Sequence, residues 1–205
     1  MVSTSASNAA RLDCAAAFAL SEEFNRNALR LSSRELLHND LALLRGEVQP
    51  SEPIEFVRDE GSDARDWVGT TYATLQLVSP KFLRLLDEHG FTGWTTFPVE
   101  LALDISQALE GYRGLAITGR CGRIEEEMSE RITLPPPVPQ GHSRPGLRGL
   151  CFEPDSWDGS DLFMPEDSAW VLATEQVIGA LKYAGIVGVV YRRRSEIELP
   201  VLGGK

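Results

Sequence analysis

The segment that decides the fold is LVSPKFLRLLDEHGFTG, residues 77–93. Ser79 is a typical N-cap residue, and Pro80 follows at the first helical position, where its missing N–H removes no helical hydrogen bond. Apolar side chains then recur with helical spacing until Gly90, which fits the left-handed C′ position of a Schellman ending. The segment therefore predicts a helix over 80–89 that ends at a glycine and leads into an extended stretch.

The same pattern occurs a second time in LATEQVIGALKYAGIVG, residues 172–188. The matching residues are 95 positions apart (172 − 77 = 95), and four of the five pairs are identical. The pairs are Leu77 and Leu172, Ser79 and Thr174, Leu86 and Leu181, Gly90 and Gly185, and Gly93 and Gly188. Either the unit is duplicated, or two generic units follow the same capping rules; with so few identities we favour the second explanation. Both explanations predict a second short helix, over 175–184, that ends at a glycine and leads into a strand.

The rest of the chain indicates short strands joined by turns and loops. Strands are indicated at 54–57, 114–118 and 147–152, and a further helix at 34–44. Together these elements predict a single α+β domain, in which a mixed or antiparallel sheet is covered on one face by the two glycine-terminated helices. We expect residues 71–200 to form this domain, and residues 1–70 to be a partly helical N-terminal segment that is packed on it or appended to it.

The composition is that of a globular protein with an acidic surface. The chain has 205 residues, of which 42% are hydrophobic and 24% charged, so wholesale disorder and a fibrous repeat are disfavoured. Twenty Lys and Arg against thirty Asp and Glu give a net charge of −10, which repels phosphate backbones and disfavours non-specific binding of nucleic acid. Such a surface serves solubility alone or suits a basic protein partner.

The sequence also favours a cytoplasmic protein. The longest apolar run near the N-terminus, residues 14–20, has seven residues, whereas a membrane-spanning helix needs about 20. The residues before this run do not form a convincing secretory signal. Three cysteines, Cys14, Cys121 and Cys151, show no short-range pairing pattern, which fits a reducing compartment. We therefore expect a cytoplasmic location and no membrane segment.

An acidic and aromatic loop is predicted at residues 152–163, FEPDSWDGSDLF. Asp155, Asp158 and Asp161 are three residues apart, and three carboxylates in a loop could hold a hard cation such as calcium, although the spacing is not that of an EF-hand. Alternatively, the Asp and Ser side chains form successive turns while the aromatic residues anchor the loop on the core. In a third interpretation Trp157 anchors a partner-binding surface. We favour the turn interpretation, which leaves a partner-binding role open.

No catalytic constellation is visible in the sequence. The glycine motifs that bind dinucleotides and phosphates are absent, as is the zinc motif H-E-x-x-H. Cys121, His142 and Cys151 are spaced too irregularly for a typical zinc site. The acidic run Glu125-Glu126-Glu127 is either solvated or faces a basic partner, and Arg192-Arg193-Arg194 is interpreted as a solvated strand end. We expect no cofactor and no metal.

Several segments between residues 75 and 197 carry a resemblance to a known family. They are Tyr112-Arg113-Gly114-Leu115-Ala116-Ile117, Cys121-Gly122-Arg123-Ile124, the loop 152–163 and Thr174-Glu175-Gln176-Val177. In these segments the chain resembles a bacterial family that was first catalogued as a domain of unknown function and later assigned to the immunity proteins of polymorphic toxin systems. The resemblance implies a non-enzymatic inhibitor that binds a cognate toxin domain and masks its active site or substrate groove.

The candidate partner-binding residues are acidic or aromatic. They are Glu125, Glu126, Glu127, Asp155, Trp157, Asp158 and Asp161. The expected partner is a protein toxin with a basic surface, such as a nuclease, and we expect neither a nucleic-acid nor a membrane partner. Two alternatives remain open: a metal-dependent hydrolase that uses the Asp-rich turn 155–161, and an adaptor module that binds another protein.

Overall fold

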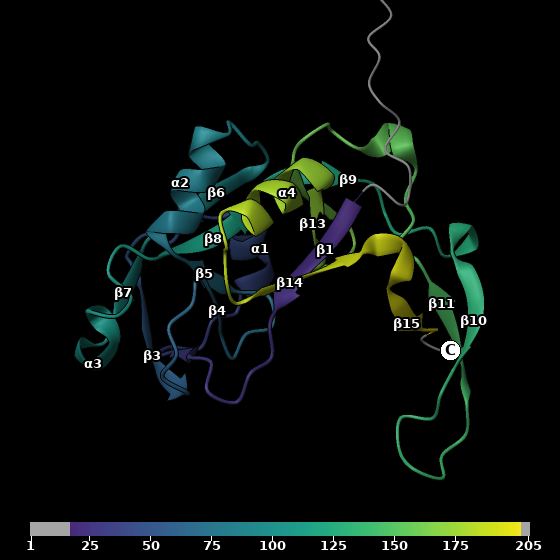
Figure 1. Ribbon diagram of the computed structural model, residues 1–205, viewed down its shortest axis with the longest axis horizontal. Helices are drawn as coiled ribbons and strands as arrows, with labels where there is room; N and C mark the ends of the chain where they lie inside the picture. Colours follow the sequence, from purple (N-terminus) through teal and green to yellow (C-terminus); the bar gives the residue numbers. More distant parts are fainter. Residues whose placement is uncertain (1–16, 202–205) are drawn as a thin grey trace, which may run out of the picture.

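The computed structural model describes residues 17–201 and shows a mixed α+β fold (Figure 1). The α-helices of this part are α1 (Asp40–Leu44), α2 (Pro80–Glu88), α3 (Leu103–Ser106) and α4 (Glu175–Tyr183). The first strands are β1 (Ala17–Glu22), β2 (Arg30–Ser33), β3 (Ile54–Glu60), β4 (Trp67–Gly69), β5 (Gln76–Val78), β6 (Trp94–Phe97) and β7 (Val99–Leu101). The others are β8 (Arg113–Ile117), β9 (Gly119–Cys121), β10 (Glu130–Leu134), β11 (Arg144–Arg148), β12 (Leu162–Pro165), β13 (Val171–Thr174), β14 (Val189–Arg193) and β15 (Glu198–Pro200). The α+β class predicted from the sequence is confirmed.

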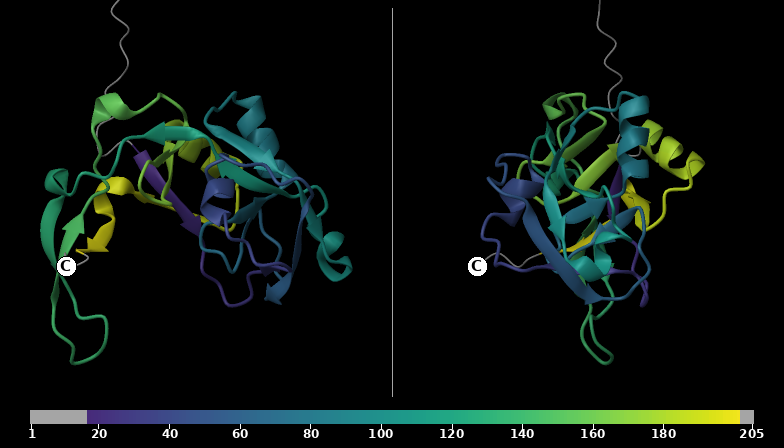
Figure 2. Two further views of the ribbon diagram at one scale, coloured as in Figure 1. Left: turned by 180° about the vertical axis from the view of Figure 1, so that it is seen from behind. Right: turned by 90° about the vertical axis from the view of Figure 1, so that its left-hand side faces the viewer.

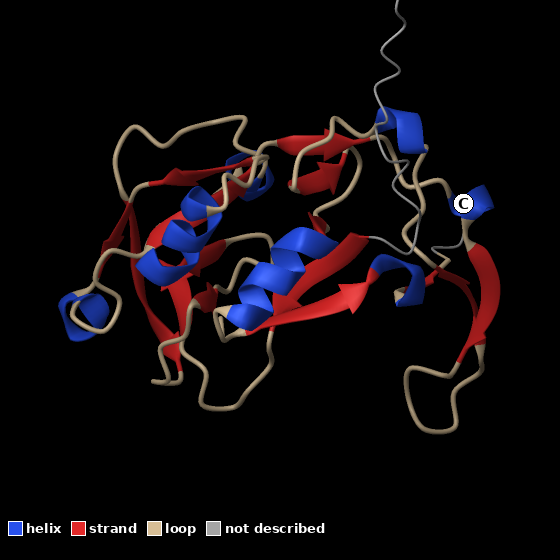
Figure 3. Cartoon of the chain, turned by 45° about the horizontal axis from the view of Figure 1, so that its top comes forward, coloured by secondary structure: helices blue, strands red, loops and turns tan. Residues whose placement is uncertain are grey.

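The strands of the described residues form four sheets rather than one. The two larger sheets have the orders β14-β1-β13-β12-β9 and β4-β5-β8-β6, and the smaller ones are β2-β3-β7 and β10-β11-β15. Pairing is antiparallel except between β3 and β7 and between β9 and β12. Helices α2 and α4 contact each other and lie side by side next to the larger sheets (Figure 3). No helix in the described part of the chain is long and apolar enough to cross a bilayer.

Helices α2 and α4 end as the capping rules predict. The Ser79 hydroxyl caps α2 by accepting a hydrogen bond from Phe82 N at 3.1 Å. Gly90 and Gly185 adopt φ values of 67° and 60°, the left-handed conformation of the C′ position. The Schellman hydrogen bonds run from Phe91 N to Leu86 O and from Ile186 N to Leu181 O, each at 3.0 Å. Both predicted helices, and the strands that follow them, are therefore present.

The match between the two segments extends well beyond the helices. One unit consists of β4, β5, α2 and β6, and the other of β12, β13, α4 and β14. A strand from elsewhere in the chain, β8 in the first unit and β1 in the second, pairs antiparallel with both strands that flank the helix. The registers agree with a shift of 95 positions: Leu77 pairs with Gly114, and Leu172 pairs with Ala19. Capping rules do not set strand register, so the structure supports a duplication, the explanation that the few sequence identities did not favour.

Reciprocal hydrogen bonds join the two units. Asp66, which precedes β4, accepts one from Val187 N at 3.1 Å, and Asp161, which precedes β12, accepts one from Thr92 N at 2.9 Å. The accompanying backbone bonds run from Trp67 N to Val187 O and from Leu162 N to Thr92 O. Each unit therefore holds the turn that follows the helix of the other unit.

Two glycines allow this close approach between the units. Gly93 and Gly188 have φ values of 86° and 91°, which side-chain-bearing residues rarely adopt. A Cβ at Gly93 would also overlap the carbonyl oxygen of Leu162, and a Cβ at Gly188 would overlap that of Trp67. The conformation and the packing at these positions both require glycine.

The described part of the N-terminal third, from residue 17 onward, contributes to the core, and residues 1–16 lie outside the described residues. Strand β1 lies inside the five-stranded sheet, between β14 and β13, and its residues Phe18 and Leu20 are buried in the main hydrophobic cluster. Strand β1 is thus an integral part of the core rather than an appended segment, and the division into residues 1–70 and 71–200 stays a prediction. A short buried strand has no alternating pattern and cannot be distinguished from other apolar runs. Of the helix expected over 34–44, only α1 is helical.

Strands β10, β11 and β15 form an arm that projects from the rest of the molecule, with the loop 135–143 at its tip (Figure 2). Arg194 lies where the arm joins the body, and its side chain is fully buried. Its Nη1 donates to Leu150 O at 2.9 Å, and its guanidinium lies 4.1 Å from the centre of the Phe152 ring. The interpretation of the arginine run as a solvated strand end is therefore wrong for Arg194, although Arg192 is exposed.

Candidate partner-binding site

The Asp-rich loop forms successive turns, as the favoured interpretation predicts. A single 3₁₀ turn, η2 (Pro154–Ser156), is followed by a turn that Asp158 organises. Oδ1 of Asp158 accepts hydrogen bonds from the backbone N–H and the hydroxyl of Ser160, and Oδ2 accepts one from Arg120 N at 2.7 Å. Both carboxylate oxygens of Asp158 are thus used within the chain.

Trp157 anchors this loop on a small core. Its ring centre lies 5.5 Å from that of Phe163, a fully buried residue, and its Nε1 donates to Ser160 O at 3.1 Å. The Trp157 side chain nevertheless remains partly exposed. The Trp157 side chain can therefore both anchor the loop and form part of a contact surface.

Asp161 and Asp155 have different surroundings. The Asp161 carboxylate accepts hydrogen bonds from the backbone N–H and hydroxyl of Thr92, and so belongs to the link between the two units. Asp155 is exposed and forms no ion pair within residues 17–201. The three carboxylates therefore do not converge on one point. No group of three or more His, Cys, Asp or Glu residues in the described part of the chain is arranged to hold a metal ion.

Replacing Asp158 by alanine should lower the free energy of unfolding by about 0.5–2 kcal/mol, because two backbone N–H groups lose their acceptor. The matched control is Asp155→Ala in the same loop, which should change it by less than about 0.5 kcal/mol. Urea unfolding of both variants measures the difference. Equal destabilisation by the two substitutions would contradict the structural role of Asp158.

The structure brings acidic residues from three loops together. Gly122 N donates to Ser156 Oγ at 2.8 Å, and Ile124 N donates to Asp167 Oδ1 at 3.2 Å. These bonds place the turn η1 (Glu126–Met128) near η2 and near the loop between β12 and β13. We call the resulting set the acidic surface: Glu125, Glu126, Glu127, Glu153, Asp155, Glu166 and Asp167, all of them exposed. None of these side chains forms an ion pair with another described residue.

Apolar side chains lie among these carboxylates. Met128 is 44% exposed, and Ile124 and Trp157 are partly exposed. Glu125–Glu127 and Asp155 were expected to face a partner, and the fold adds Glu153, Glu166 and Asp167, which the sequence pattern does not single out. The sequence gives no sign that Glu166 and Asp167 belong to this set, because only the hydrogen bond between Ile124 and Asp167 brings them next to the other acidic residues.

The scattered cysteines and histidine do not form a zinc site. Cys121 and Cys151 are buried, whereas His142 is exposed on the loop at the tip of the arm. Burial raises the pKa of the Cys121 thiol to about 12, so this group is a neutral thiol at physiological pH. A neutral thiol is a poor metal ligand and nucleophile.

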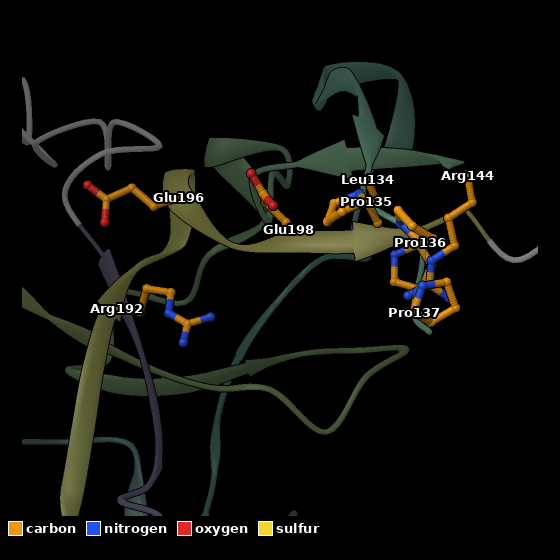
Figure 4. A pocket seen from close by; sticks show the side chains of 9 residues that line it. Leu134, Pro135, Pro136, Pro137, Arg144, Arg192, Glu196 and Glu198 are labelled. Atoms are coloured by element: carbon orange, nitrogen blue, oxygen red, sulfur yellow. The ribbon is translucent and has the colours of Figure 1, made fainter. Parts of the chain in front are cut away.

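A groove of about 590 Å³ runs along the arm, from the end of β14 to the start of the loop 135–143 (Figure 4). Residues 134–137, Arg144 and Arg192 line it together with Glu196 and Glu198. The labelled charged side chains are spread along the groove rather than pointing to one centre. The groove therefore does not provide the convergent polar groups that a catalytic site needs.

Comparison with protein-family models gives no match to the chain, and comparison with curated proteins gives none either.

Proposed function

We propose that this protein is an immunity protein that binds a cognate toxin domain and neutralises it without chemical modification. In this proposal the acidic surface meets a basic surface of the toxin and covers its active site or substrate groove. The observation that carries the proposal is the set of seven exposed carboxylates, from three loops, that have no cationic partner in the described part of the chain.

The physical argument rests on charge and desolvation. Carboxylates that are already paired within a protein gain little from a second cation, whereas unpaired ones attract a basic partner over a distance of about 10 Å. Charge complementarity of this kind mainly raises the association rate, and apolar contacts at its centre then provide affinity. Met128, Ile124 and Trp157 supply such contacts among the carboxylates.

The alternative of a metal-dependent hydrolase has less support. It requires Asp155, Asp158 and Asp161 to share a cation, but the carboxylates of Asp158 and Asp161 accept hydrogen bonds from separate backbone groups. An adaptor that binds another basic protein uses the same surface, and only the identity of the partner distinguishes it from an immunity protein.

The proposal is tested with the product of a toxin-like gene next to the gene for this protein. Co-expression should rescue cells from that product, and the two proteins should co-purify as a complex. Failure to rescue, together with no complex at micromolar concentrations, would rule out this toxin–immunity pair and with it the proposal. Rescue by a protein that does not bind the toxin would equally contradict a mechanism of occlusion.

Charge reversal of Glu125, Glu126 and Glu127 to lysine should lower the association rate with the toxin by about tenfold or more at low salt, and weaken its salt dependence. The reason is the loss of the attractive field, since none of the three side chains forms an ion pair within residues 17–201. Stopped-flow association at several salt concentrations measures both effects.

The control for this experiment reverses three exposed acidic residues that lie together at the β2-β3-β7 sheet, Glu35, Glu52 and Glu100. This variant changes the net charge equally, so it separates a local surface from the overall charge. An equal fall in rate for both variants would assign the effect to net charge and remove the acidic surface as the binding site.

A further inference from the structure

A second cavity, of about 500 Å³, lies between equivalent loops of the two duplicated units. One loop joins β4 to β5 and contributes Tyr72; the other joins β12 to β13 and contributes Trp170. Glu22, Arg30 and Gln76 also line the cavity. Aromatic rings and ionisable groups therefore meet where the two units face each other, which is a common location for ligand sites.

A glycine leaves room for the Glu22 side chain at this cavity. Gly69 lies beside it, and a Cβ at that position would overlap the Glu22 carboxylate. The Glu22 side chain is only 25% exposed, and burial raises the pKa of its carboxyl group. The Glu22 carboxylate is thus partly shielded from water, which disfavours its charged form, and the glycine at position 69 leaves the space that it occupies.

The duplication shows that the fold does not require these polar groups. The positions 95 residues after Glu22, Gly69 and Gln76 are occupied by Ile117, Met164 and Val171, which are all buried and apolar. The equivalent positions on β8, β12 and β13 thus complete the same strand pairing with apolar side chains. The strand pairing itself therefore does not require Glu22 or Gln76.

Internal contacts leave this polar set incompletely satisfied. Arg30 lies 3.5 Å from a carboxylate oxygen of Glu22 and 3.5 Å from one of Glu60, so one cation serves two carboxylates. Gln76 donates from Nε2 to Ala73 O at 3.2 Å, but its Oε1 has no hydrogen-bond partner among the described residues. Arg30 Nε also makes no hydrogen bond to a described residue, although it lies 3.5 Å from the Glu22 carboxylate. In formal charge the group Glu22–Arg30–Glu60 has one carboxylate more than it has cations, and Gln76 Oε1 is an additional unpaired acceptor.

We propose that this cavity binds a primary ammonium or guanidinium group, with Glu22 as its counter-ion, Gln76 as a further acceptor, and Tyr72 and Trp170 as aromatic walls. A carboxylate next to aromatic rings is the usual way in which proteins recognise such cations. The cation would bring the missing positive charge to the Glu22–Arg30–Glu60 group and offset the cost of keeping Glu22 ionised there. The cavity is not part of the acidic surface, and this inference holds or fails independently of the toxin-binding proposal.

The test compares three probes of equal length and different charge: butylamine, 1-butanol and butyrate. Binding is followed by the NMR signal of the Trp170 indole N–H, which a Trp170→Phe variant identifies. Butylamine should give saturable shifts, while butanol and butyrate should bind at least about tenfold more weakly. Equal or tighter binding of the neutral or anionic probe, or no binding of any probe, would overturn the proposal.

Variants then assign the contacts. Glu22→Gln keeps the size of the side chain and should weaken butylamine binding at least tenfold, and Gln76→Val, which copies the second unit, should weaken it severalfold. Glu60→Gln is the matched control, because Glu60 contacts Arg30 but does not line the cavity; it should change binding less than Glu22→Gln. Thermal unfolding of each variant checks that the fold is intact. Unchanged butylamine binding by folded Glu22→Gln would contradict the assignment.

The same chemistry can come from a free amine or from a lysine side chain of a protein. A short peptide with blocked ends and one central lysine distinguishes the two sources. Binding of both butylamine and the peptide supports recognition of a protein side chain, whereas binding of butylamine alone supports a small-molecule ligand. If neither binds, the cation site is rejected.

Discussion

Replacing Gly93 or Gly188 by alanine is expected to lower the free energy of unfolding by about 3–5 kcal/mol, among the largest effects of any single substitution in this chain. Both residues have positive φ values, and at both a Cβ would overlap a backbone carbonyl of the other unit. Backbone cannot move aside as the end of a flexible side chain can, so the two units would have to separate locally. Guanidinium unfolding followed by circular dichroism measures the loss.

Two other glycines provide matched controls. Gly90 has a positive φ of 67° but open space where a Cβ would lie, so Gly90→Ala should cost only about 1 kcal/mol. Gly179 lies in α4 and also has open space at this position, so Gly179→Ala should stabilise the protein by about 0.5–1 kcal/mol. The order of these effects separates conformational strain from overlap. Similar losses for Gly90→Ala and Gly93→Ala would contradict the close contact between the units.

Arg194→Ala should lower the free energy of unfolding by about 3–5 kcal/mol, because it empties a fully buried site and leaves Leu150 O without its donor. The loss of the guanidinium also removes the contact with the Phe152 ring, on which the junction between arm and body is packed. Urea unfolding measures the effect, and limited proteolysis should show earlier cleavage within the arm.

The control for Arg194 is its neighbour in the same arginine run. Arg192 is exposed and lines the open groove, so Arg192→Ala should change stability by less than about 0.5 kcal/mol. If both alanine variants were equally stable, Arg194 would not support the arm.

The helices and their endings could be predicted because their signals are local. Ser79, Gly90 and Gly185 specify caps through bonds to residues a few positions away, and the structure contains each of these helix ends. The α+β class followed from these units and from the short strand patterns between them.

The relation between the units could not be predicted from those signals, because it depends on contacts across about 95 residues. Asp66 and Asp161 are separated by 95 positions, as the paired glycines are. A comparison of the residues before the two helices would therefore have identified these two aspartates as equivalent. What they bind, the turn of the opposite unit, follows only from the three-dimensional arrangement. The place of β1 was missed for a similar reason, since its partners β13 and β14 are far away in sequence.

In the candidate site, too, local features could be predicted from the sequence and long-range ones could not. Glu125–Glu127 and Asp155 could be selected because they form an acidic run and part of an Asp-rich loop, and they are exposed. The carboxylates of Asp158 and Asp161 are used internally, which a spacing of three residues does not reveal. Glu22 at the second cavity had no sequence signal, because its significance depends on Gly69 and on the apolar residues at the equivalent positions of the other unit.

The interleaved position of β1 has a consequence for biosynthesis. The strand is made about 150 residues before either of its neighbours, β13 and β14, and the second of them ends at Arg193. While the chain is still on the ribosome, β1 therefore has two open edges and an apolar sequence that must be kept from other chains. The five-stranded sheet closes only after β14 has left the ribosome, so this protein acquires its final form late in its synthesis and slowly for its size.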